Sequence, residues 1–98
     1  MPVANVPVPD LNPRVIAQRL RTIRQARGMS QTDVAAAAKI NLGNYNEIEH
    51  AKRQSFQVKI LYRLCHVLGV RPDYLLGLSD DPTPQWTRHE VAPSDTSP

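Results

Sequence analysis

Apolar residues recur at helical spacing along the middle of the chain, between two proline-rich ends. Ile16, Leu20 and Ile23 follow one another at i, i+4 and i+7, a period that places them on one face of a helix. Asn12 is a suitable N-cap and is followed by proline, the residue favoured at the first helical position, whereas Gly28 ends the pattern. The pattern therefore predicts a first helix between these two residues.

A second, short helix is predicted from Gln31 to about residue 37. Ser30 can cap its first amides, and Asp33 can reach back in an arrangement close to a capping box. Four successive alanines, 35–38, present little side-chain area, so we expect them to let another helix approach closely.

A third helix is predicted over Leu42–Glu49. Asn41 is its N-cap candidate. The helical period turns Tyr45 and Ile48 toward the core, which leaves a polar outer face.

Two further helices complete the pattern. Ser55 is the N-cap candidate of a fourth helix, which Gly69 closes. Its apolar stripe is expected to consist of Val58, Leu61, Leu64, Cys65 and Leu68. Pro72 opens a last short helix, whose Leu75 and Leu76 are expected to face the core.

Five predicted helices and no strand signal make residues 12–78 a compact all-α domain. Prolines crowd both ends of the chain, so we expect a flexible N-terminal arm over residues 1–11. From residue 79 the composition turns to Asp, Pro, Ser and Thr, with Trp86 as the one large apolar side chain. This composition predicts a disordered acidic tail over residues 79–98.

Length and composition fit one small domain. The chain has 98 residues, of which 41% are hydrophobic, an ordinary share for a globular protein. Its single cysteine cannot form an internal disulfide, and this fits a reducing compartment. No run approaches the ~18 consecutive apolar residues of a membrane span. We therefore expect a soluble, cytoplasmic protein.

The charges are unevenly distributed along the chain. It carries 12 Lys plus Arg against 9 Asp plus Glu, a net charge of +3. Residues 12–78 carry +7, whereas residues 79–98 carry −3. The basic body favours a polyanionic partner, which is nucleic acid or an anionic membrane surface.

Residues that could support catalysis or bind a metal are scattered. His50, His66 and His89 lie in separate segments without metal-ligand spacing, and Cys65 lies on the apolar stripe of a predicted helix. The sequence contains no glycine-rich phosphate loop. We therefore expect no enzyme activity, no metal and no cofactor.

A series of short motifs occurs in a fixed order through the helical domain. They are RLRTIRQARGMSQ at residues 19–31, Val34-Ala35, Ile48-Glu49, Lys52-Arg53, LGV at 68–70 and DYLLG at 73–77. In this order and spacing, over residues 12–78, the sequence resembles the Cro/repressor-type (XRE-type) helix-turn-helix family. The resemblance implies a regulator that binds double-stranded DNA, in which the second helix of the motif enters the major groove.

The resemblance makes residues 42–49 the recognition helix, and the helical period selects its outward residues. Asn44 and Asn46 are candidates for pairing with adenine, and Glu47 is a candidate for accepting from cytosine N4. Leu42 is a candidate for contact with a thymine methyl, and Gly43 shares this face. Each of these residues is otherwise a solvated surface residue.

Phosphate contacts position such a domain without reading sequence. The resemblance implies a backbone-clamping role for Gln31 and makes Lys52 and Arg53 a basic loop after the recognition helix. Asn41 and His50 are further phosphate-binding candidates, one at each end of that helix. The positive charge gathers on the first helix and in this loop, where phosphates are expected.

The resemblance also implies an ion pair between Arg24 and Glu49. In the family this pair joins the first helix to the end of the recognition helix and fixes its orientation. We therefore assign both residues to the scaffold, since losing one partner of a buried pair costs about 3 to 5 kcal/mol.

The sequence departs from the family pattern at three positions. Lys39 and Ala51 stand where the family usually has glycine, in turns that often need a positive φ. We therefore expect altered local geometry there. Tyr45 stands at a usually aliphatic inward position, and its hydroxyl is expected to point out toward the groove.

Two functions fit the sequence. The first is a sequence-specific transcriptional regulator, a repressor that binds an inverted-repeat operator as a homodimer, with the fourth and fifth helices and the tail as dimer candidates. The second is a protein-interaction module on the same fold, antitoxin-like or an anti-repressor partner. It is motivated by a recognition helix that has Glu47 on its outer face and no Lys or Arg. A regulatory protein partner would then take the place of DNA.

Overall fold

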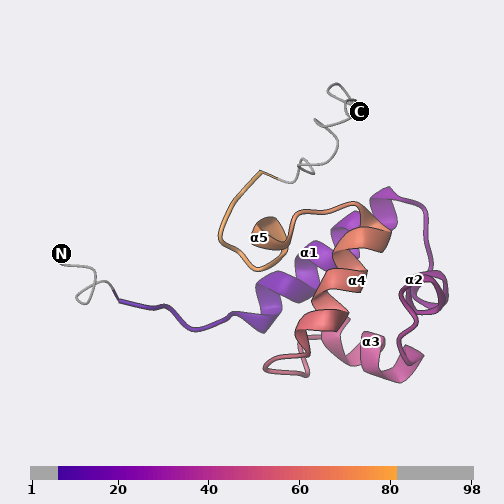
Figure 1. Ribbon diagram of the computed structural model, residues 1–98, viewed down its shortest axis with the longest axis horizontal. Helices are drawn as coiled ribbons and strands as arrows, with labels where there is room; N and C mark the ends of the chain where they lie inside the picture. The colour runs from indigo at the N-terminus through magenta and orange to yellow at the C-terminus, as the bar shows by residue number, and fades with distance from the viewer. Residues whose placement is uncertain (1–6, 82–98) are drawn as a thin grey trace, which may run out of the picture.

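The computed structural model describes residues 7–81, which form five α-helices (Figure 1). They are α1 (Pro13–Ala26), α2 (Gln31–Ala38), α3 (Leu42–Glu49), α4 (Val58–Leu68) and α5 (Pro72–Leu75). No strand occurs among these residues, and the all-α prediction is confirmed. None of these helices has the length and apolarity needed to cross a membrane. Trp86, His89 and most of both predicted terminal segments lie outside the described residues.

The first three helices begin where their capping residues predict. The Asn12 side chain accepts from the backbone amide of Arg14 at 3.0 Å, and Asn41 accepts from the Asn44 amide at 3.1 Å. Ser30 and Asp33 form a complete capping box, with both bonds 3.0 Å long. The bonds from Ser30 lower the pKa of Asp33 below its ordinary value. Sequence-local hydrogen bonds therefore set these helix starts.

The start of α4 differs from the prediction. Ser55 does not cap α4; the N-cap position is Gln57, which makes no side-chain cap bond. Val58 is 79% exposed, whereas Ile60 is buried in its place. Two residues correspond to a rotation of about 200° around a helix, so these two side chains point in opposite directions. The rest of the predicted stripe is buried or half-buried against the core, namely Leu61, Leu64, Cys65 and Leu68.

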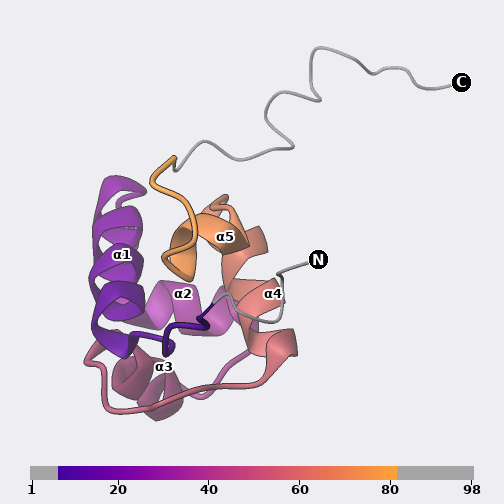
Figure 2. The ribbon, with the colours of Figure 1, turned by 90° about the vertical axis from the view of Figure 1, so that its left-hand side faces the viewer.

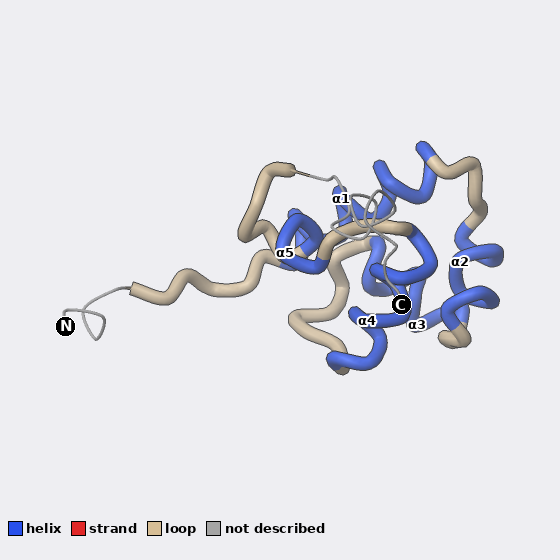
Figure 3. The backbone as a smooth tube through the Cα atoms, turned by 45° about the horizontal axis from the view of Figure 1, so that its top comes forward, coloured by secondary structure: helices blue, strands red, loops and turns tan. Residues whose placement is uncertain are grey.

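The helix-turn-helix pair α2–α3 is held by the other three helices. α1 packs against α3 and α5, and α4 packs against α2 and α5. Figures 1 and 2 show α3 at the lower end of the domain and α5 above it. A short turn joins α2 to α3, and a longer loop joins α3 to α4 (Figure 3). The outer side of α3 is therefore available to a partner.

One apolar cluster occupies the space between the helices. Its large fully buried members include Leu20, Val34, Tyr45, Leu64, Leu68, Val70 and Leu75. Ala35 and Ala38 of α2 are also buried in this cluster, and α2 packs against α4. The close helix approach predicted for the alanine run is therefore confirmed at Ala35 and Ala38, whereas Ala36 and Ala37 are exposed.

Two turns contain non-glycine residues in the left-handed region. Lys39 has φ 58° and Ala51 has φ 59°, the conformation that glycine adopts most easily. Backbone bonds hold both turns: the Ile40 amide donates to the Ala35 oxygen at 2.9 Å, and the Lys52 amide donates to the Glu47 oxygen at 2.9 Å. The expectation of altered geometry is therefore wrong. The helix-end hydrogen bonds impose the positive φ and the side chains tolerate it.

Candidate nucleic-acid interface

The Glu49 carboxylate lies at the junction of α1, α2 and α3. Within the described chain, Glu49 is the one charged residue in the buried core, with 0% exposure. Arg24 of α1 donates to both oxygens, from Nε to Oε2 at 2.8 Å and from Nη2 to Oε1 at 2.9 Å. Gln31 of α2 donates from Nε2 to Oε1 at 2.8 Å, and Tyr45 of α3 donates to Oε2 at 2.5 Å. The carboxylate therefore ties three helices together.

These hydrogen bonds keep the carboxylate ionised despite its burial. Burial by itself raises the pKa of Glu49, but the bonds from Arg24, Tyr45 and Gln31 outweigh it and the pKa lies below its ordinary value. The hydrogen bond to Glu49 in turn raises the pKa of Arg24. Both groups are therefore charged, and the Arg24–Glu49 pair is an ion pair within the domain.

The Tyr45 hydroxyl points into the domain. Tyr45 is 0% exposed, and its hydroxyl donates to Glu49 one helical turn further along α3. The expectation of an outward hydroxyl is therefore wrong, whereas the inward ring is confirmed. Burial is the main cause that raises the pKa of Tyr45, and the hydrogen bond to Glu49 is the second. The phenol therefore stays protonated and donates. The i, i+4 spacing of the two residues was the sequence signal, because such pairs share a helix face.

Gln31 links the buried carboxylate to the surface of α3. Its Nε2 donates to Glu49, and its Oε1 accepts from Asn46 Nδ2 at 3.1 Å. Gln31 and Asn46 are both half-buried. Arg21 adds a bond from α1, from its Nη1 to the backbone oxygen of Glu49 at 2.7 Å. The position of α3 is thus fixed by polar bonds in addition to apolar packing.

The first turn of α3 presents a small mixed surface. Leu42 is 44% exposed, and Gly43 is also exposed. A Cβ atom at Gly43 would lie 3.0 Å from Asn41 Oδ1, the oxygen that caps α3. Asn44 is half-buried, and within the described chain its Oδ1 is buried without a hydrogen-bond partner. Leu42 and Gly43 are therefore the more accessible of the predicted base-reading residues here, and any larger residue at Gly43 would crowd the cap.

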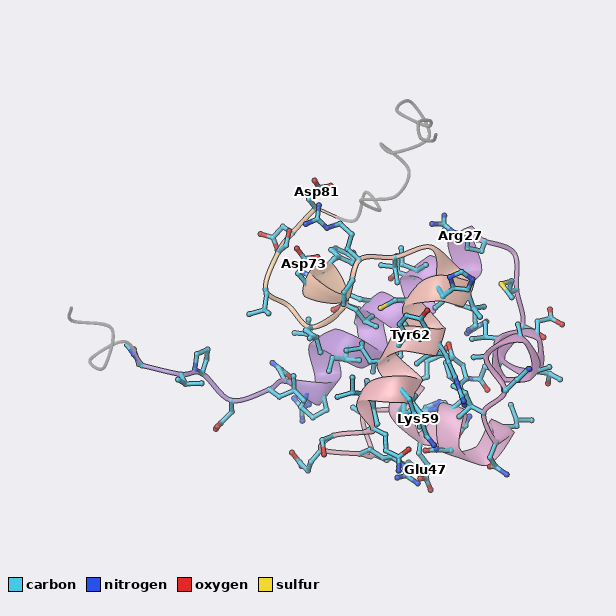
Figure 4. The ribbon with its side chains drawn as sticks, in the orientation of Figure 1. Arg27, Glu47, Lys59, Tyr62, Asp73 and Asp81 are labelled. Atoms are coloured by element: carbon cyan, nitrogen blue, oxygen red, sulfur yellow. The ribbon has the colours of Figure 1, made fainter. Side chains whose placement is uncertain are left out.

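Glu47 and Arg53 form an ion pair at the end of α3. Arg53 Nε lies 2.9 Å from Glu47 Oε1, and the side chains are 44% and 48% exposed, respectively. His50 and Lys52 are exposed nearby in sequence, with His50 Nδ1 2.7 Å from the backbone oxygen of Asn46. Figure 4 shows Glu47 at the end of the domain opposite Asp81. This end of the domain therefore combines the Glu47 carboxylate with side chains that are able to bind phosphate, namely those of His50, Lys52 and Arg53.

Arg19 of α1 holds the segment that follows α5. Its Nη1 donates to the backbone oxygens of Tyr74 and Ser79, the latter at 2.7 Å. Its Nη2 lies 3.1 Å from Asp80 Oδ1, and its guanidinium lies 4.1 Å from the centre of the Tyr74 ring. This arginine is therefore a structural residue at the end of the domain away from α3.

The arginines in the C-terminal half of α1, and Arg27 directly after it, also have partners inside the domain. Arg27 donates from Nε to the backbone oxygen of Leu68, at the end of α4, at 2.9 Å. Arg21 and Arg24 both bond to Glu49. Assigning the charge of the first helix to phosphate binding overlooked these internal contacts, which join positions far apart in sequence. The Arg14 side chain, by contrast, is exposed.

The sequence profile of the helix-turn-helix family matches residues 20–75, which include α2 and α3. They also include the Glu49 cluster, which consists of Glu49 and the three residues that donate to its carboxylate, Arg24, Gln31 and Tyr45. The chain belongs to the Cro/repressor-type (XRE-type) helix-turn-helix family. This is a family of DNA-binding transcription regulators and not of enzymes, as the sequence predicted.

One relative in sequence is the uncharacterized HTH-type transcriptional regulator YobD of Bacillus subtilis (strain 168). It is 39% identical over 77 residues, which are 76% of this chain and 65% of YobD. The chain therefore spans slightly less than two thirds of that relative.

Two solved structures share the arrangement of helices. The N-terminal DNA-binding domain of SinR from Bacillus subtilis is 25% identical, with a TM-score of 0.62 over 64% of this chain and 91% of that domain. The clp gene regulator ClgR from Corynebacterium glutamicum is 25% identical, with a TM-score of 0.62 over 74% of each chain. Both likenesses confirm the fold predicted from the sequence.

Proposed function

We propose that this helix-turn-helix regulator binds duplex DNA sequence-specifically, with α3 in the major groove. The observation that carries the proposal is the Glu49 cluster, which locks α3 onto α1 and α2. A recognition element must hold its side chains in one orientation to discriminate base edges, and a buried ionised cluster supplies that rigidity. The cytoplasm, where DNA is accessible, is the compartment proposed for this activity.

The base-reading residues proposed on α3 differ in how available they are. Asn46 and Glu47 carry polar groups suited to adenine and cytosine edges, and Leu42 offers an apolar contact for a thymine methyl. The small Gly43 leaves room for close approach of a base. Asn44 is half-buried and its Oδ1 is buried, so Asn44 is less available to a base than Leu42, Gly43 or Glu47.

Phosphate binding is proposed for the residues that flank α3. Lys52 and His50 are exposed, and Arg53 can exchange Glu47 for a phosphate oxygen because their ion pair lies at the surface. Gln31 retains one Nε2 hydrogen for a phosphate after donating the other to Glu49. Asn41, at the N-terminus of α3, lies at a helix end that favours anions.

A homodimer on an inverted repeat is the assembly we propose, with repression as its mode of action. The α4–α5 face carries an apolar groove of about 390 Å³. Its lining consists of Val58, Leu61, Tyr62, Cys65, His66 and Pro72. Val58 and Tyr62 are 79% and 73% exposed, which is unusual for apolar side chains that share a surface. We propose that a second copy of the chain covers this face; binding to an inverted repeat would require the two α3 helices of the dimer to lie about one DNA turn apart.

The experiment is an in vitro selection of sequences from random duplexes, run at two salt concentrations. We expect recovery of a palindrome, and log affinity should fall with log salt with a slope near −0.9 per phosphate contacted. Undetectable binding at low salt, or binding that salt does not weaken, would overturn the proposal. Sedimentation of the protein with and without the selected duplex then tests the dimer.

A second candidate, a protein-interaction module, is favoured by one observation. The outer face of α3 carries Glu47 and no cationic residue, and Glu47 forms an ion pair with Arg53 of the following loop. A stoichiometric partner protein that still binds after Lys52→Glu and Arg53→Glu would support this alternative, because both substitutions introduce negative charge that repels DNA phosphates.

A further inference from the structure

The hydrogen bonds that run from Glu49 through Gln31 to Asn46 have a defined polarity. An ionised carboxylate can only accept, so the Gln31 atom that faces Glu49 is the donor Nε2. The other end of the Gln31 amide is then the acceptor Oε1, and the Asn46 atom that faces it is the donor Nδ2. The negative charge of Glu49 therefore determines the orientation of the side-chain amides of both Gln31 and Asn46.

We propose that Glu49 is a positioning residue which, through Gln31, holds the Asn46 amide with its Oδ1 turned away from the domain and toward a bound base. This inference rests on the proposed DNA-binding function. Asn46 Oδ1 accepts no hydrogen bond from the described residues, whereas its Nδ2 keeps one hydrogen beyond the bond to Gln31. The free edge of Asn46 thus offers an acceptor beside a single donor.

This free edge selects among bases. Adenine presents an N6 amino donor next to the N7 acceptor, which matches both free groups of Asn46. Cytosine presents an N4 amino donor, which matches Oδ1 alone. Guanine and thymine present acceptors at the corresponding positions, and these would face Oδ1 without a proton between them. Asn46 therefore reads adenine first, cytosine second and disfavours the other two bases.

The same asparagine without the link to Glu49 would not discriminate in this way. A free amide can rotate by half a turn and offer its NH₂ group to guanine N7 or O6. Gln31 prevents this rotation because Oε1 has no hydrogen to give to an Asn46 oxygen. The base preference thus originates at the buried Glu49 carboxylate, which acts through Gln31 and Asn46 and does not itself contact DNA.

The first test needs no DNA. The substitution is made at Gln31, because Glu49→Gln would also break the ion pair with Arg24. In ¹⁵N NMR spectra of the full chain, one Nδ2 hydrogen of Asn46 should exchange slowly with solvent, and Gln31→Met should abolish this protection. Fast exchange of both Nδ2 hydrogens in the unaltered protein would overturn the proposed orientation.

The second test compares base preference by selection from random duplexes. The position read by Asn46 is the one whose preference Asn46→Ala removes. We expect adenine over guanine by about tenfold there in the unaltered protein, falling to less than about threefold in Gln31→Met. Loss of a Gln31 phosphate contact would weaken all sequences alike and so would not mimic this change. An unchanged preference in Gln31→Met would overturn the proposal.

Tyr45→Phe is the matched control. It removes another hydrogen bond to Glu49 and leaves the link through Gln31 intact. The base preference of Tyr45→Phe should equal that of the unaltered protein. If Tyr45→Phe instead lost the preference for adenine as much as Gln31→Met does, the cluster would act only through the stability of the domain, and this would overturn the proposal. Binding to no duplex at all would refute the DNA-binding function, and the NMR experiment would then still decide the orientation of Asn46.

Discussion

The hydroxyl of Tyr45 donates a 2.5 Å hydrogen bond to Glu49, one turn further along the same helix. Both residues are 0% exposed, so this bond joins two groups that have no contact with water. Its acceptor is charged, and hydrogen bonds to charged groups are stronger than neutral ones. The bond therefore belongs to the core of the domain and not to its surface.

Tyr45→Phe should lower the free energy of unfolding by about 1.5 to 3 kcal/mol, because it leaves a buried charge with one donor fewer. Denaturant unfolding monitored by circular dichroism measures the change. Tyr62→Phe is the control, since Tyr62 is 73% exposed and should give almost no change. Equal effects of the two substitutions would contradict this account of the cluster.

Acid should destabilise the domain through Glu49. Its folded-state pKa lies below the ordinary value of 4.5, so its contribution is fully present above about pH 5 and is lost as the pH falls through the folded-state pKa. Asp33, whose pKa is also lowered, adds in the same direction. Glu49→Gln should be less stable at neutral pH and lose stability less steeply between about pH 5 and 3. Parallel pH profiles for the two proteins would contradict the prediction.

Glycine should stabilise the two left-handed turns. Ala51→Gly and Lys39→Gly each remove about 1 to 2 kcal/mol of backbone strain from the folded state. Each also makes the unfolded chain more flexible, which lowers the free energy of unfolding by about 0.5 to 1 kcal/mol. We therefore expect a net gain of about 0.5 to 1 kcal/mol in thermal unfolding. Ala36→Gly, at an exposed position inside α2, is the matched control and should cost about 1 kcal/mol. A loss of stability at both turns would show that the positive φ carries no strain.

The Glu47–Arg53 pair should restrain non-specific DNA binding. Glu47→Gln removes a carboxylate that repels phosphate and frees Arg53, so affinity for random duplex should rise about two- to fivefold. Arg53→Gln should instead reduce the salt slope by about 0.9. Fluorescence anisotropy at several salt concentrations measures both changes. Asp10→Asn is a charge-matched control, because Asp10 lies beside the start of α1 and the residues that follow α5. Weaker binding by Glu47→Gln would contradict the prediction.

The sequence predicted what depends on local spacing. Asn12, Ser30 and Asn41 each cap a helix because their hydrogen bonds reach only two or three residues along the chain. The start of α4 was not predictable in this way, since Gln57 makes no cap bond and the position of the helix is set by burial of Ile60. Long-range packing, and not propensity, decides that boundary.

Only part of the candidate site was predicted, because several of its contacts also join residues far apart in the sequence. Arg24 and Glu49 came from the family resemblance, and no local pattern indicated that Gln31 would join them. The bond between Gln31 and Asn46 depends on how α2 and α3 cross, which the fold alone determines. Tyr45 shows the limit most clearly: its inward position followed from the helical period, but the direction of its hydroxyl followed from a buried acceptor on the same helix.

The contacts of Arg19 fix where the described chain leaves the domain. By bonding to Ser79 and Asp80, this arginine fastens the exit of the chain beside α1 and α5. Asp81 lies at the end of the domain opposite Glu47 (Figure 4). A fluorophore or fusion partner attached beyond Asp81 thus starts from a fixed point remote from α3, which makes this end the one to tether when the opposite surface must stay free.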